Sequence, residues 1–228
     1  MSPQEPTTFE NRRLRDLRCQ NKDSVIKPYL RRLDLSDPEN FHAVLMPNLN
    51  CSGLRFLRDH GVPGKNIYAV ERDRRVHALQ RNPDPRTQPH LVGLQTTDVP
   101  MNLLESLDSI FVSIRARDVK IDLFYLDFYG RAGAEHAESL EKVFGLNMLS
   151  PNGTLILTLG TNRSNKDRVI FQRAVERATG RSVSSFLVNS WAARYGRVCP
   201  KTLERQYRSK GGGNQNILYT TSYFHFGE

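Results

Sequence analysis

Short apolar runs alternate with segments of helical period along most of this chain, and this alternation constrains the fold more than any other feature. The expected strands cover residues 43–46, 66–70, 90–94, 121–126 and 154–159. The expected helices follow them at residues 54–60, 72–81, 103–114, 135–147 and 166–178. Strands that alternate with helices form βαβ units with right-handed crossovers, which build a parallel sheet covered on both faces. We therefore predict an α/β fold, a three-layer α-β-α sandwich.

The pattern changes after the last expected helix. Residues 183–188 and 217–226 are typical of strands, with no helical pattern between them. An antiparallel hairpin at the edge of the sheet, joined by a long loop, accounts for two strands in this order. Residues 1–24 are polar and basic, so we expect an N-terminal extension followed by a single domain over residues 25–228.

Composition indicates the kind of partner and the compartment. The chain has 228 residues and a formal net charge of +9, from 33 Lys and Arg against 24 Asp and Glu. Such an excess favours a nucleic acid partner, because Lys and Arg displace counterions from phosphates; a generic basic surface is the alternative. The three cysteines are scattered, the start is polar, and no apolar run is long enough to span a membrane. We therefore expect a cytoplasmic protein without disulfides, membrane contact or a bound metal.

The candidate site should lie in the loops after the expected strands, because parallel sheets bind ligands beyond the carboxyl ends of their strands. After the first strand, residues 47–53 include Asn48, Asn50, Ser52 and Gly53 and lead into a helix. Small residues there let backbone N–H groups approach a ligand, and the helix dipole adds positive charge. An ordinary strand-to-helix turn is the alternative, since the loop has a single glycine.

Acidic residues follow the second and third strands. Glu71 lies 18 residues after Gly53, a position from which a carboxylate can accept hydrogen bonds from ribose hydroxyls. The alternative is a carboxylate that caps the helix behind it. Asp98 could accept a hydrogen bond from an adenine amino group, or it could cap a turn.

The most apolar strand, residues 121–126, leads into Asp127-Phe-Tyr-Gly130. Burial of a carboxylate there without a partner would be costly, so we expect Asp127 to face a cleft, where it could orient an amine or accept its proton. Phe128 and Tyr129 could stack on a planar base. Core packing of Phe128 and a capped turn at Asp127 are the alternatives.

The order of these features is similar to that of class I S-adenosylmethionine-dependent methyltransferases, and the resemblance implies a Rossmann-like fold over about residues 43–226. Four segments carry it: residues 46–53, Glu71, residues 127–130, and Leu149-Ser-Pro-Asn-Gly153 before the fifth strand. The last of these resembles the Leu-x-Pro-Gly-Gly turn of that family, whose sheet also ends in an antiparallel strand.

The resemblance implies S-adenosylmethionine as the cofactor and assigns the site residues. The cofactor-binding residues would be Asn48, Asn50, Ser52, Gly53, Glu71 and Asp98. Within this set, Glu71 would hold the ribose and Asp98 would meet the adenine. The catalytic residues would be Asp127, Phe128 and Tyr129, because their tetrad resembles that of enzymes that methylate exocyclic amines of bases.

Two segments depart from the family pattern. Met46 stands near the usual acidic position of the first loop, and residues 47–49 occupy much of the usual glycine stretch. Phe128 and Tyr129 stand where the tetrad of the family usually has proline at the second and sometimes at the third position. Short first loops of this kind resemble those of methyltransferase-like proteins of phages and mobile elements.

Basic and aromatic residues are mixed between residues 191 and 210, which we expect to form a loop. The basic ones are Arg194, Arg197, Lys201, Arg205, Arg208 and Lys210. Trp191, Tyr195 and Tyr207 are interleaved with them, as in grooves that bind single-stranded nucleic acid. A solvated loop with Trp191 in the core is the alternative.

These features together predict a methyltransferase that acts on an amino group of a nucleobase in RNA or DNA. A catalytically degenerate, nucleic-acid-binding protein of the same fold is the alternative that the atypical first loop favours. A nicotinamide-dependent enzyme is disfavoured because the chain has no GxGxxG motif. The basic balance disfavours a methyltransferase for small molecules or proteins without excluding it.

Overall fold

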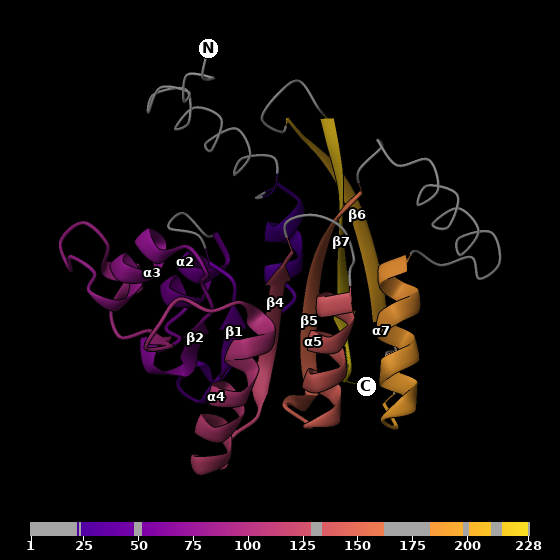
Figure 1. Cartoon of the computed structure of the whole chain (residues 1–228), viewed down its shortest axis with the longest axis horizontal. Coiled ribbons are helices and arrows are strands. Elements are labelled where there is room, and N and C mark those ends of the chain that lie inside the picture. Colours follow the sequence, from indigo (N-terminus) through magenta and orange to yellow (C-terminus); the bar gives the residue numbers. More distant parts are fainter. Residues whose placement is uncertain are drawn as a thin grey trace.

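A computed structural model of the chain contains a seven-stranded sheet with helices on both faces (Figure 1). It describes residues 22, 24–47, 52–128, 134–161, 183–197, 201–210 and 216–227. The strands, in spatial order, are β3 (Gln95–Thr96), β2 (Ile67–Ala69), β1 (Ala43–Leu45), β4 (Ile121–Asp127), β5 (Leu149–Thr161), β7 (Asn216–His225) and β6 (Lys201–Lys210).

The first five strands are parallel, and the last two run against them. β1 pairs in parallel with both β2 and β4, while β7 pairs antiparallel with β5 and β6. The order of the parallel strands changes direction between β1 and β4. Open α/β sheets bind ligands at such a switch point, beyond the carboxyl ends of the strands.

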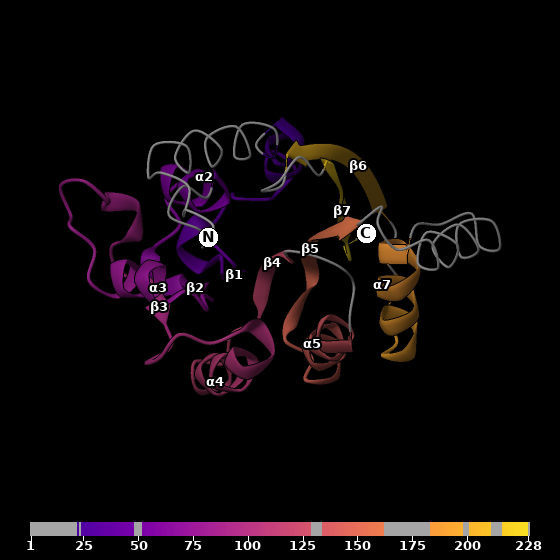
Figure 2. The ribbon, with the colours of Figure 1, turned by 45° about the horizontal axis from the view of Figure 1, so that its top comes forward.

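The helices form two layers, as the tilted view in Figure 2 shows. They are residues 24–30, α2 (Ser52–Asp59), α3 (Arg74–Arg81), α4 (Leu103–Ala116), α5 (Ala134–Gly145) and α7 (Val183–Arg194). Residues 24–30 and α2 pack on one face of the sheet, and α4, α5 and α7 pack on the other. The predicted three-layer α-β-α fold with an antiparallel C-terminal pair is therefore confirmed.

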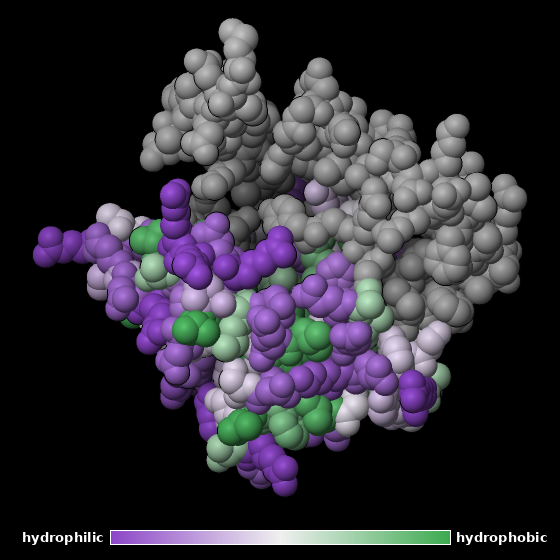
Figure 3. All heavy atoms as spheres, in the orientation of Figure 1, coloured by the Kyte–Doolittle hydropathy of each residue, from purple (hydrophilic) through white to green (hydrophobic). Residues whose placement is uncertain are grey.

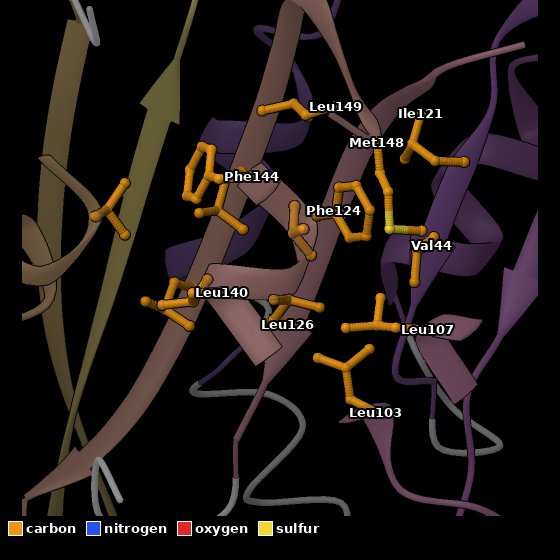
Figure 4. Close-up of a cluster of buried hydrophobic side chains, with 14 of the residues drawn as sticks. Val44, Leu103, Leu107, Ile121, Phe124, Leu126, Leu140, Phe144, Met148 and Leu149 are labelled. Atoms are coloured by element: carbon orange, nitrogen blue, oxygen red, sulfur yellow. The ribbon is translucent and has the colours of Figure 1, made fainter. Parts of the chain in front are cut away.

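β4 is apolar along its length because both of its faces are covered. Phe124 and Leu126 point into the cluster under α4 and α5, whereas Leu123 and Tyr125 point into the cluster under residues 24–30. Figure 4 shows Phe124 in the middle of the first cluster, between Val44 and Phe144. This packing holds the carboxyl end of β4, and with it Asp127, in a rigid sheet.

Local signals define where the elements begin. Asn102 and Glu105 form a reciprocal capping box at the start of α4, so two otherwise unsatisfied backbone N–H groups have partners. At the start of β5, a Cβ on Gly153 would lie 2.9 Å from the carbonyl oxygen of Ser150, which leaves room only for glycine. The turn that resembles the family's Leu-x-Pro-Gly-Gly segment thus needs its glycine for packing.

The third strand was predicted in the wrong place. Pro89–Leu91 form a 3-10 helix, Gly93 has φ 78°, and the short strand β3 begins only at Gln95. A positive φ breaks an extended run, and an apolar run this short does not distinguish strand from helix.

The helical spacing of Val76 and Leu79 predicts that both point inward from α3, and the structure contradicts this for Leu79. Leu79 is 39% exposed, and the buried side chains are His77 and Gln80. His77 Nε2 lies 2.9 Å from Thr97 O, and Gln80 Nε2 donates to Pro47 O at 2.9 Å. These polar side chains face inward because they bind backbone carbonyls of the neighbouring loops.

The C-terminal region contains two further corrections. Residues 183–188 belong to helix α7, and residues 201–210 form β6, the partner of β7 in the hairpin, where a loop was expected. Val188 and Ala192 of α7, one turn apart, are buried against the sheet. The helix predicted at residues 166–178 lies outside the described residues.

The surface agrees with the polar composition. In its lower half, Figure 3 shows hydrophobic side chains as small separate groups among hydrophilic ones. No helix within the described ranges is both long and apolar enough to cross a membrane. The same residues contain no cluster of three or more metal-ligating side chains.

Candidate cofactor and acceptor site

A cavity lies at the carboxyl ends of β1, β2 and β4, where the strand order changes. It contains about 710 Å³ of space, part of it open to solvent. Its walls include Met46 after β1, Glu71 after β2, and Asp127 and Phe128 at the end of β4. Two of the predicted site carboxylates, from loops more than fifty residues apart, thus border one cavity.

Glu71 lies directly after β2, with its carboxylate turned toward the backbone before α3. Its Oε1 accepts a hydrogen bond from Asp73 N at 2.8 Å. Burial raises the pKa of this carboxyl, and the backbone amides of Asp73 and Arg72 partly oppose the rise. Asp73, not Glu71, caps α3, because Asp73 Oδ1 accepts from the backbone amides of Arg75 and Val76. The carboxylate of Glu71 therefore lines the cavity without serving as the helix cap.

Asp98 lies outside the walls of this cavity and lines a second, more open one. The two cavities share Val70 and Met101 in their walls. The Asp98 side chain is exposed and lies 3.5 Å from the guanidinium of Arg81, which also donates to the Asp98 carbonyl oxygen.

Asp127 is buried at the end of β4, and its partner is Lys22, a helical residue just before the helix of residues 24–30, which we call the N-terminal helix. The ammonium of Lys22 forms an ion pair with Asp127 Oδ2. The same ammonium lies 5.6 Å from the centre of the Tyr125 ring. A buried carboxylate is costly unless it is paired. Lys22 thus explains why a charged group can occupy this position, and no sequence pattern links two residues 105 positions apart.

Phe128 forms one wall of the cavity together with a histidine that the sequence analysis missed. Its ring centre lies 4.1 Å from that of His136, and the planes are tilted by 37°. His136 and Glu135 stand in the first turns of α5 and both line the cavity. The only signal that could have found them is their position, just after the loop that follows β4.

Not every predicted cofactor residue can be placed. Ser52 and Gly53 begin α2, and Gly53 is buried. Asn48, Asn50 and Tyr129 lie outside the described residues. Within the described part of the chain, the cavity therefore joins Glu71, Asp127 and Phe128.

The predicted nucleic-acid-binding residues separate into two groups. Arg194 lies 3.5 Å from Glu141 and stacks beside Trp191. Arg197 donates to Ser150 O and to Asn147 Oδ1, both at 3.0 Å, so its guanidinium ties α7 to the turn before β5.

The second group belongs to β6. Lys201 and Arg205 are exposed, and the backbones of Arg208 and Lys210 pair with β7. The expected continuous basic loop is thus a helix end and a strand, with the arginines of the helix end engaged in structural contacts.

Comparison with known proteins identifies the fold. No family model and no curated protein matches the chain. Among solved structures, the chain is similar to a geranyl diphosphate methyltransferase in complex with SAM, with TM-score 0.53 and 8% identity over 98% of this chain and 93% of the other. A putative sarcosine dimethylglycine methyltransferase from Galdieria sulphuraria has TM-score 0.50 and 16% identity over 96% of this chain and 88% of the other. The strand order, the switch-point cavity and these likenesses together show that the chain has the fold of the class I S-adenosylmethionine-dependent methyltransferases.

Proposed function

We propose that the protein is an S-adenosylmethionine-dependent methyltransferase that acts on an amino group of a nucleobase in RNA or DNA. One observation carries the proposal: a single cavity at the switch point is bordered by a carboxylate from the end of β2 and another from the end of β4. Glu71 suits the cofactor and Asp127 suits the acceptor, so the two partners of a transfer would meet between them.

The walls of the cavity suit the cofactor. When bound, S-adenosylmethionine supplies a methyl group on a sulfonium, ready for transfer to a nucleophile. Ionised Glu71 accepts hydrogen bonds from the ribose hydroxyls, a charge-assisted contact worth about 1.5–3 kcal/mol each. Met46, Val70 and Met101 offer apolar walls on the same side. The chain contributes the alignment of cofactor and acceptor.

Asp127 orients the acceptor in this proposal. Lys22 binds Oδ2, and Oδ1 accepts a hydrogen bond from the acceptor amine. That hydrogen bond directs the nitrogen lone pair away from the carboxylate and toward the cofactor. Phe128 and His136 line the cavity with rings tilted by 37° to each other, and a planar base stacks against one of these rings.

Two features support a nucleic acid as the acceptor molecule. The net charge of +9 favours a polyanion, and the exposed basic residues of β6 belong to the same sheet as Asp127. A small-molecule acceptor does not require this charge.

The catalytically degenerate, nucleic-acid-binding protein is the second candidate. Its support is the atypical first loop and the pairing of Asp127 with Lys22, since an ammonium already holds one oxygen of the carboxylate.

Calorimetric titration with S-adenosylmethionine and S-adenosylhomocysteine tests the cofactor site. We expect micromolar binding by the full chain, an affinity typical of enzyme ligands. Glu71→Ala should weaken it by at least about tenfold, because a loss of about 1.5 kcal/mol already has that effect. Glu39 is exposed and lies just before the amino end of β1, away from the carboxyl ends that border the cavity. The control variant Glu39→Ala should therefore bind the cofactor as the wild type does. A folded protein that binds neither compound refutes the enzyme and leaves the second candidate.

Transfer of a labelled methyl group to RNA and to single-stranded DNA tests the acceptor. Asp127→Ala should abolish transfer and retain cofactor affinity, because its proposed contact is with the acceptor. Equal loss of transfer and of cofactor binding would remove Asp127 from the acceptor site.

A further inference from the structure

The helix of residues 24–30 packs on one face of the sheet, against the strand β7 that pairs with the edge strand β6 (Figure 2). Tyr29 of the helix is buried, with its ring centre 5.5 Å from that of Tyr223 and its hydroxyl donating to Thr221 O at 3.3 Å. Thr221 and Tyr223 belong to β7, where they pair with Arg205 and Leu203 of β6. The helix thus packs on β7, next to the last strand of the sheet, β6.

The alternation of side chains along β6 decides which of them face the helix. Paired residues of neighbouring strands point to the same face, so Arg205 and Lys201 share the face of Tyr223. Glu204 points to the other face, where its carboxylate accepts from Ser222 Oγ at 3.0 Å.

Tyr29 lies where the helix meets this part of the sheet. Burial raises its pKa to about 12; the positive charges of Arg205 and Arg32 act against the rise, and the negative charge of Glu204 adds to it.

The outer face of the helix continues the positive charge. Lys27 and Arg31, one turn apart, are exposed, and Arg32 is exposed beside them. The sequence has no acidic residue between positions 24 and 33. Among the described residues, no ion pair with an Asp or Glu involves these three side chains or Arg205, in contrast to Arg194.

We propose that these residues form a binding surface for the phosphates of single-stranded nucleic acid, which we call the helix–strand basic surface. Its members are Lys27, Arg31, Arg32, Lys201 and Arg205. The proposal deepens the proposed function and rests on it for one point, that the acceptor is a nucleobase.

The surface is close enough to the cavity to guide a strand into it. Asp127 pairs with Thr158, Thr158 with Thr221, and Thr221 with Arg205, so three strand spacings separate Asp127 from Arg205. At ~4.8 Å per spacing this is about 14 Å. Lys22, two residues before the described helix 24–30, already contacts Asp127. A stacked strand at ~3.4 Å per nucleotide covers such a distance in about four nucleotides.

The burial of Asp127 favours a single strand over a duplex. Its side chain is 8% exposed, so a base must leave its stack to reach it. Unpaired bases do so at the lowest cost.

The composition of the surface favours nucleic acid over an acidic protein. Protein interfaces have an apolar core, whereas Leu203, 37% exposed, is the only hydrophobic residue between positions 201 and 206.

Fluorescence anisotropy with a labelled 20-nucleotide oligouridylate, at several salt concentrations and without cofactor, tests the surface on the full chain. The test variant is the double substitution Arg32→Gln/Arg205→Gln. The matched control is Arg86→Gln/Arg115→Gln, which removes the same charge from exposed sites elsewhere. Loss of two phosphate contacts should reduce the slope of log K against log salt concentration by about 1.4. If the affinities of wild type and variant are equal at ~1 M salt, the variant then binds about 25-fold more weakly at ~0.1 M salt. The control should keep more of both the slope and the affinity.

Three outcomes would overturn the proposal. Equal slopes for the test and control variants would show that only net charge matters. Binding of a 20-base-pair duplex as tight as that of the single strand would contradict the path to an unpaired base. Binding to phosphatidylserine vesicles that depends on Arg32 and Arg205, without binding to the oligonucleotide, would assign the surface to membranes.

Circular dichroism and the cofactor titration, repeated on the same variants, separate this test from that of the proposed function. The double variant should keep its fold and its affinity for S-adenosylmethionine. A wild type that binds oligouridylate through this surface but binds no cofactor would refute the enzyme and leave the surface standing.

Discussion

Removal of the Lys22 ammonium should destabilise the protein far more than removal of a neighbouring lysine. The side chains of Lys22 and Asp127 are 15% and 8% exposed, so Lys22→Met leaves a carboxylate charged and buried without its partner. Breaking a buried ion pair costs about 3–5 kcal/mol. Asp127 borders a cavity that admits water, which places our expectation at the lower end, about 3 kcal/mol. For a chain of this size that lowers Tm by about 6–12 °C.

Urea unfolding of a double-mutant cycle measures the effect. Lys27→Met, exposed on the same helix, should cost no more than about 0.5 kcal/mol. Lys22→Met/Asp127→Asn should recover much of the loss, because neither charge then remains buried alone, and we expect a coupling energy of about 2 kcal/mol. Two results would refute the ion pair and with it the explanation of the buried carboxylate. One is an equal loss of unfolding free energy for Lys22→Met and Lys27→Met. The other is a double variant whose loss equals the sum of the two single losses.

Three further predictions follow from the described contacts. Because burial raises the pKa of Glu71, this carboxyl loses its charge at a higher pH than an ordinary glutamate does. Cofactor affinity measured by calorimetry should therefore fall as the pH is lowered toward that pKa. Glu71→Gln should show no such pH dependence. Tyr29→Phe should cost about 1 kcal/mol in urea unfolding through loss of the hydrogen bond to Thr221. Since the pKa of Tyr29 is raised from 10.0 to about 12, the wild type should lose stability as the pH rises from about 10 to about 12. If Tyr29→Phe lost as much stability over this pH range, the loss could not be assigned to Tyr29. Phe124→Ala should cost about 3–5 kcal/mol by calorimetric or urea unfolding, because the side chain is fully buried; a cost below about 1 kcal/mol would show that the core collapses around the gap.

The fold was predictable where hydrophobic periodicity extends over a whole element. The apolar run of β4 is covered on both faces, and the helical period of α4 extends over four turns, so both appear in the structure within two residues of their predicted bounds. The runs at 90–94 and 183–188 were too short to distinguish a strand from a helix. In those places packing against neighbouring elements decides the conformation. The first run contains a 3-10 helix before β3, and the second belongs to helix α7.

The candidate site was predictable to the extent that it follows the strand ends. Glu71 follows β2 by two residues and Asp127 is the last residue of β4, and parallel strands bring their carboxyl ends to one side of a sheet. His136 and Lys22 were not predictable, because they reach the cavity from helices whose position depends on packing against the sheet.

The sequence by itself determined the parallel order of strands and helices, the acidic residues at two strand ends and the excess of positive charge. These follow from local periodicity, residue type and composition, which need no knowledge of distant contacts. Only the tertiary structure decided that Lys22 pairs with Asp127, that Arg197 binds the turn before β5, and that Arg205 pairs with the residue of β7 that Tyr29 contacts. Each of these depends on how segments far apart in the chain pack together. Burial and charge pairing are properties of that packing, and the order of residues along the chain does not encode them locally.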